Sequence, residues 1–152
     1  ININEVMETQ KNRYPLLFLD KVIYLEPGVS ATGIKNFSYN EWFFPPHYPN
    51  DPNVPGFIQV ECLVQTFIMT FLSLPKYKGS KTNFLDINNA KFRKKLIPGD
   101  TLKTEATLHS LKRGIAKGVA IGSVNGEHAC SASFLVSIPF EFDKFIPKKV
   151  IL

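Results

Sequence analysis

One histidine and one glutamate stand out in this sequence because of the segments that carry them. His47 lies in a loop with five prolines between residues 45 and 55, and Glu61 is the one carboxylate of the apolar run 57–74. Imidazole titrates near neutral pH, and a carboxyl enclosed by apolar groups keeps its proton to higher pH. The pair is typical of a general base and a general acid, with a surface histidine and a helix-edge glutamate as the simpler alternatives.

Two further residues could assist this pair. Gly56 opens a predicted helix, whose first N–H groups are unpaired and could polarise a substrate carbonyl, although a glycine chosen only for the turn is equally consistent. Gln65 lies one turn after Glu61 on the same helix face and could hydrogen-bond to it. No two of the histidines have the spacing of zinc ligands, and the cysteines form no C-x-x-C pattern, so no metal site is predicted.

The elements that must hold these residues are one helix and a sheet. The helix is predicted from Gly56 to Leu74, after Pro55 and before Pro75, and its apolar residues point nearly all round, which indicates an enclosed helix. Strands are predicted over residues 13–25, 29–38, 82–92, 101–111, 115–124 and 127–139, with turn signals at Pro98-Gly99-Asp100 and Asn125-Gly126. On one face of residues 115–124, positions 116, 118, 120 and 122 are alanine or glycine, small enough for a helix to pack closely. The pattern predicts an α+β fold in which an antiparallel sheet curls around one helix, with residues 1–152 as a single domain.

Composition narrows the class of protein. The chain has 152 residues, of which 44% are hydrophobic and 20% charged, and this is typical of a globular protein. Cys62 and Cys130 lie in core-like patterns and are expected to be reduced, which with the absence of a signal-peptide pattern favours the cytoplasm. Three polar residues in the apolar run argue against a membrane span. The net charge of +5 favours an acidic partner, whereas the aromatic residues are placed poorly for nucleic-acid binding.

A longer set of motifs extends along most of the chain. The run from His47 to Gly56 has the form H-[FY]-P-x-x-P-x-x-P-G and is followed by Glu61 and Gln65. Further matching runs are residues 13–17, 20–22, 40–46, 90–94 and 98–102. In this order they resemble the β-hydroxyacyl-acyl carrier protein dehydratases of the FabZ type, which have the hotdog fold. The chain departs from that family at Pro46, where a glycine is usual, at Phe57 and Gln59, and in the bulk of Phe67, Met69 and Phe71.

The resemblance implies a reaction and a role for each residue. His47 would remove the α-proton of a 3-hydroxyacyl thioester, and Glu61 of a second subunit would protonate the departing hydroxyl. The Gly56 N–H would hold the thioester carbonyl, with Phe57 and Gln65 as further substrate contacts and with no cofactor. The substrate would be carried by acyl carrier protein, an acidic protein that Lys91, Arg93, Lys94 and Lys95 could bind. The protein would be a homodimer, in which the two sheets join, or a trimer of dimers.

Two other functions remain open on the sequence. A hotdog enzyme of another acyl pathway would use the same scaffold, as would a thioesterase that hydrolyses the thioester with a helix carboxylate. A non-catalytic acyl- or carrier-binding protein would follow if Pro45-Pro46 displaced His47.

Overall fold

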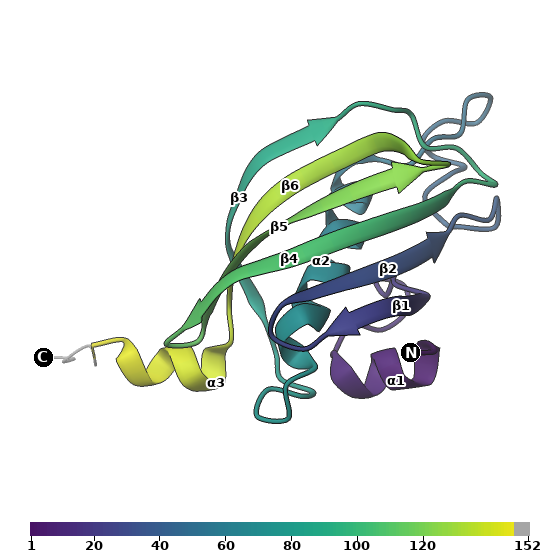
Figure 1. The fold of residues 1–152 in the computed structure, drawn as a ribbon. Coiled ribbons are helices and arrows are strands. Elements are labelled where there is room, and N and C mark those ends of the chain that lie inside the picture. Colours follow the sequence, from purple (N-terminus) through teal and green to yellow (C-terminus); the bar gives the residue numbers. More distant parts are fainter. Residues whose placement is uncertain (148–152) are drawn as a thin grey trace, which may run out of the picture.

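The structure is a computed structural model and describes residues 1–147. Its helices are α1 (Ile3–Thr9), α2 (Gly56–Leu72), α3 (Pro139–Phe142) and the short 3-10 helix η1 (Asp143–Phe145). Its strands are β1 (Lys21–Glu26), β2 (Ser30–Asn36), β3 (Asn83–Phe92), β4 (Thr101–Lys112), β5 (Ile115–Val124) and β6 (Glu127–Ser137). The strands form one antiparallel six-stranded sheet in the order β1-β2-β4-β5-β6-β3, which curves around α2 (Figure 1). The predicted α+β arrangement is confirmed.

Helix α2 is the core around which the sheet bends. Every residue from Cys62 to Leu72 is buried, as the apolar run predicts, and the helix ends two residues before the predicted Leu74. The sheet approaches closely because the buried positions 116, 118, 120 and 122 of β5 are alanine or glycine. A Cβ on Gly118 would lie 2.5 Å from a ring carbon of Phe67. No helix within residues 1–147 has the length and apolarity needed to cross a bilayer. Only the first two turns of α2, around Phe57 and Glu61, keep partial exposure.

The N-terminal part of the chain differs from the prediction. The strand predicted over residues 13–25 begins only at Lys21, because the N–H groups of Phe18 and Leu19 both donate to the side chain of Gln65 instead of to a strand. The polar lead before it forms α1, a helix that was not predicted. Asn2 caps α1, and the Glu5 carboxylate accepts a hydrogen bond from the Asn2 N–H in a capping box.

Strand β3 is unlike the other strands because it buries neither face. It lies at one edge of the sheet, and all ten of its residues are exposed. Four of them are large apolar side chains, Phe84, Leu85, Ile87 and Phe92. A long, apolar edge strand is a surface that a protein normally pairs or covers.

Candidate active site

His47 is held in one tautomer by its own loop. Its ring Nδ1 lies 3.1 Å from the carbonyl oxygen of Asn53, and its backbone carbonyl accepts from the Asn53 N–H at 3.0 Å. A carbonyl oxygen can only accept, so Nδ1 carries the hydrogen and donates it. The ring also stacks on Tyr48, with 4.5 Å between the ring centroids. In the neutral form of the ring, Nε2 is therefore the nitrogen that is free to accept a proton.

Glu61 is a partly buried carboxyl whose partner is Gln65. Burial raises the pKa of Glu61 above its ordinary value, and the hydrogen bond from Gln65 lowers it by less. That bond runs from Gln65 Nε2 to Glu61 Oε1 at 2.8 Å, as the helical spacing predicts. A carboxyl that keeps its proton towards neutral pH is suited to act as a general acid.

Gln65 has no hydrogen-bonding capacity left for a substrate. Its Nε2 also donates to the Leu16 carbonyl at 2.6 Å, and its Oε1 accepts from the N–H groups of Phe18 and Leu19. The side chain is fully buried. Gln65 therefore orients the Glu61 carboxyl, and the substrate contact expected for it has no free donor or acceptor.

An apolar groove lies between α2 and β3, with Glu61 in its wall. Its volume is about 420 Å³, and its lining includes Phe57, Ile58, Val60 and Glu61 of α2 with Phe84 and Ile87 of β3. A second hollow of about 160 Å³ continues along α2 past Val64 and Ile68, and Glu61 and Phe84 line both. Phe57, a predicted substrate contact, lines the first of these hollows. His47 lines neither hollow, so the structure does not bring the predicted base and acid together within one chain.

Gly56 is the first residue of α2, and its glycine is explained by a neighbour. A Cβ at this position would lie 3.2 Å from a ring carbon of Phe92, at the end of β3. Its φ is not in the left-handed region, so the turn itself does not require glycine. Within residues 1–147, its N–H donates to no protein acceptor. The helix N-terminus therefore offers a free donor beside a flat aromatic ring.

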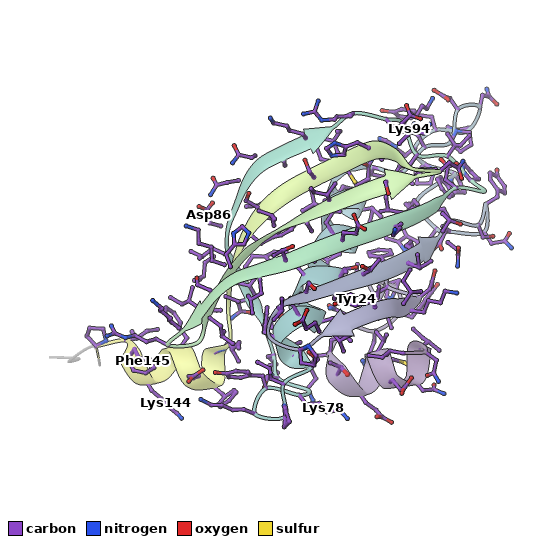
Figure 2. The ribbon with its side chains drawn as sticks, in the orientation of Figure 1. Tyr24, Lys78, Asp86, Lys94, Lys144 and Phe145 are labelled. Atoms are coloured by element: carbon purple, nitrogen blue, oxygen red, sulfur yellow. The ribbon has the colours of Figure 1, made fainter. Side chains whose placement is uncertain are left out.

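In the basic cluster of Lys91, Arg93, Lys94 and Lys95, two of the four residues form ion pairs. Lys94 pairs with Glu127 at 2.7 Å, and Lys95 forms an ion pair with Asp51. For Lys91 and Arg93 no ion pair is found within the described part of the chain. Figure 2 shows Lys94 at the opposite end of the molecule from Lys78 and Lys144. The unpaired positive charge of this cluster is thus carried by the two residues that flank Phe92.

The sequence did not identify three residues of the site, Asn53, Phe84 and Ile87. Asn53, which fixes the His47 tautomer, gave no signal beyond its place in the proline loop. Phe84 and Ile87 lie in the predicted strand 82–92, but only the position of that strand beside α2 shows that they line the groove.

The sequence matches a known family model and several curated relatives. The family model described as FabA-like domain matches residues 11–133. A 3-hydroxyacyl-[acyl-carrier-protein] dehydratase FabZ of Clostridium novyi is 41% identical over 138 residues, which are 91% of this chain and 97% of that relative. The dehydratase of the same name from Clostridium acetobutylicum is 43% identical over 140 residues, which are 91% of this chain and 98% of the relative.

A comparison of structures supports the fold. One solved structure, the dehydratase heterocomplex ApeI:P from Xenorhabdus doucetiae, matches with a TM-score of 0.77. The match covers 95% of this chain and 98% of the chain in that structure. At 16% sequence identity it supports the fold only. The predicted hotdog fold is confirmed. The family model and the curated relatives place the chain in the FabA-like domain family, among the FabZ-type 3-hydroxyacyl-[acyl-carrier-protein] dehydratases.

Proposed function

We propose that this protein is a 3-hydroxyacyl-[acyl carrier protein] dehydratase of fatty-acid biosynthesis. It removes water from a carrier-bound 3-hydroxyacyl thioester and leaves a trans-2-enoyl thioester. The observation that carries the proposal is the Glu61 carboxyl, which has a raised pKa and lies in the wall of an apolar groove. Apolar walls suit an acyl chain, and a carboxyl whose pKa is raised by burial is suited to protonate a departing hydroxyl.

The chemistry divides between two side chains. Nε2 of His47 removes the α-proton, the electron pair forms the new double bond, and the β-hydroxyl leaves with the proton of Glu61 as water. The thioester carbonyl gains negative charge as the α-proton leaves, and the free N–H of Gly56 is the donor that would stabilise it. Since Nδ1 already donates to Asn53, His47 enters the reaction with the correct nitrogen free.

The site is completed by a second copy of the chain. His47 lies outside the groove that holds Glu61, and β3, which forms one wall of that groove, is an exposed apolar edge. Pairing of β3 with the β3 of another copy would cover this edge by an isologous contact. We therefore propose a homodimer in which His47 of one subunit faces Glu61 of the other. The trimer of dimers and the cytoplasmic location stay predictions.

The reaction is tested with 3-hydroxyacyl-carrier substrates of graded chain length, analysed by mass spectrometry. Loss of one water with the thioester intact is expected, whereas free acid and thiol would identify a thioesterase instead. His47→Ala and Glu61→Gln should each reduce turnover by about 10²- to 10⁴-fold. Binding of the substrate without any turnover by the unaltered protein would identify a non-catalytic homologue and contradict the proposal.

Lys91 and Arg93 are the proposed contacts for the acidic carrier. Lys91→Glu with Arg93→Glu should raise the KM for carrier-bound substrate and leave the KM for a small pantetheine thioester unchanged. Lys78→Glu with Lys144→Glu makes the same charge change at the far end of the molecule and is the matched control (Figure 2). An equal effect of both changes on the KM would show that net charge, and not this surface, attracts the carrier.

A further inference from the structure

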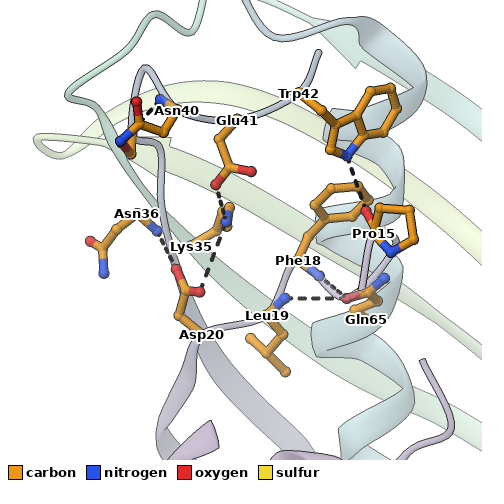
Figure 3. Close-up of polar contacts among 11 residues, drawn as sticks. Pro15, Phe18, Leu19, Asp20, Lys35, Asn36, Asn40, Glu41, Trp42 and Gln65 are labelled. Carbon is orange, nitrogen blue, oxygen red and sulfur yellow. Dashed lines mark hydrogen bonds and ion pairs between the residues drawn. The ribbon is translucent and has the colours of Figure 1, made fainter. Parts of the chain in front are cut away.

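Lys35 is a buried cation between two carboxylates. It lies on β2 and is 8% exposed, with its Nζ 2.6 Å from Glu41 Oε1 and 3.9 Å from Asp20 Oδ1 (Figure 3). The same ammonium lies 5.7 Å from the centre of the Phe37 ring. A buried lysine is costly unless it is paired, so this cluster ties three separate segments of the chain together.

Glu41 begins the loop that carries His47, and hydrogen bonds connect the two residues. The Phe44 N–H donates to the Glu41 carbonyl at 3.3 Å, and the His47 N–H donates to the Phe44 carbonyl at 3.0 Å. Phe43 and Phe44 are buried between them. Two successive hydrogen-bonded turns thus link the backbone of Glu41 to that of His47.

The other carboxylate of the cluster belongs to the segment that holds Gln65. Asp20 accepts from the Asn36 N–H at 2.7 Å and directly follows Leu19, whose N–H donates to Gln65 (Figure 3). This segment also meets the loop, because the indole N–H of Trp42 donates to the Pro15 carbonyl at 3.1 Å. Within one chain, Lys35 therefore contacts both the loop that carries His47, through Glu41, and the segment that binds Gln65, through Asp20.

We propose that Lys35 is a positioning residue for His47 and that it acts through the hydrogen bond that its ammonium donates to Glu41. This bond fixes the start of the proline loop against β2, and the turns beyond it place the imidazole and the Asn53 carbonyl that holds its tautomer. The proposal rests on the proposed role of His47 as the base, but its structural part can be measured without any turnover.

Three substitutions of Glu41 test the proposal, because Lys35 keeps Asp20 as a partner in all of them. Glu41→Ala removes the contact, Glu41→Asp keeps the charge but is one methylene too short to reach, and Glu41→Gln keeps an acceptor at the same distance. Glu41→Ala and Glu41→Asp should lower kcat by roughly 10- to 100-fold with KM changed by less than about threefold, whereas Glu41→Gln should stay within about threefold of the unaltered kcat.

The second readout is the tautomer of His47, measured by nitrogen-15 NMR on the neutral imidazole. The unaltered protein and Glu41→Gln should show a single Nδ1–H form, and Glu41→Ala and Glu41→Asp a mixture of both tautomers. Glu141→Ala removes an ion pair with Lys76 and a bond from Tyr77 elsewhere, and it should lower Tm without changing kcat or the tautomer.

The proposal is overturned if Glu41→Asp keeps the unaltered kcat and a single tautomer, or if kcat follows Tm across all four variants. Absence of dehydratase activity in the unaltered protein would instead refute the proposed function, and the NMR comparison would still decide whether Glu41 positions His47.

Discussion

Replacing Gln65 by methionine removes all the hydrogen bonds of one fully buried side chain. Two of its partners, the N–H groups of Phe18 and Leu19, belong to residues only 2% exposed and have no route to water. Leaving a buried donor unpaired costs about 1–3 kcal/mol, so the two together should cost about 2–6 kcal/mol. Domains of this kind have about 5–15 kcal/mol of stability, so the loss should be easily measured by urea denaturation.

A second glutamine on the same helix provides the matched control. Gln59 is also buried, but it makes one hydrogen bond, from Nε2 to the Val54 carbonyl at 3.0 Å, and its Oε1 has no partner within residues 1–147. Gln59→Met removes that bond together with an unpaired oxygen, so we expect a change within about 1 kcal/mol. A loss of stability in Gln59→Met as large as in Gln65→Met would refute the assignment of Gln65 as the anchor of residues 16–19.

Gln65→Met should also change the pKa of the proposed acid, Glu61. The Gln65 bond lowers the pKa of Glu61, whereas burial raises it by more. Without the bond the pKa of Glu61 rises further, and the carboxyl stays protonated to higher pH. In folded Gln65→Met protein, the high-pH limb of the kcat/KM profile should therefore move to higher pH, and a move to lower pH would contradict this reasoning.

Two further changes test the electrostatics and the packing around α2. Burial raises the pKa of Glu61, so binding of this proton contributes fully to stability below the unfolded pKa, and the contribution is lost as the pH rises through the folded pKa. Glu61→Gln should therefore gain stability over the unaltered protein as the pH rises through that window, and a difference independent of pH in urea denaturation would contradict it. Gly118→Ala should lose about 1–3 kcal/mol, because its Cβ would lie 2.1 Å from the Thr107 carbonyl oxygen and 2.5 Å from a Phe67 ring carbon. An unchanged Tm would show that the sheet can move away from the helix.

Local patterns were sufficient for most of the fold. The apolar run after Pro55 predicted α2, and turn signals on both sides predicted β5 with the observed bounds, Ile115–Val124. The first strand was predicted too long because, within its predicted range, Phe18 and Leu19 give their N–H groups to the side chain of Gln65, 47 and 46 residues away. The spacing of apolar residues along the chain does not reveal a hydrogen bond to so distant a side chain. Helix α1 is short, and only Asn2 with Glu5 signalled it.

The residues of the site could be predicted from the sequence, but most contacts between them could not. The proline frame and the isolated carboxylate identified His47 and Glu61 by type and setting, and the helical spacing predicted the bond between Glu61 and Gln65. The tautomer of His47 depends on where the Asn53 carbonyl lies, and the pairing of Lys95 depends on Asp51, 44 residues earlier. Such contacts follow from tertiary structure, so spacing in the sequence does not reveal them.

The most direct test of the central claim, a site shared between two subunits, uses mixed dimers of two inactive variants. His47→Ala and Glu61→Gln chains are co-refolded in equal amounts, and dehydration of a 3-hydroxyacyl-carrier substrate is measured. If His47 of one subunit works with Glu61 of the other, half of the dimers are mixed and hold one intact site, so activity should return to about a quarter of the unaltered value. If both residues act within one chain, every site lacks one of them, and mixtures that stay as inactive as the separate variants would contradict the account.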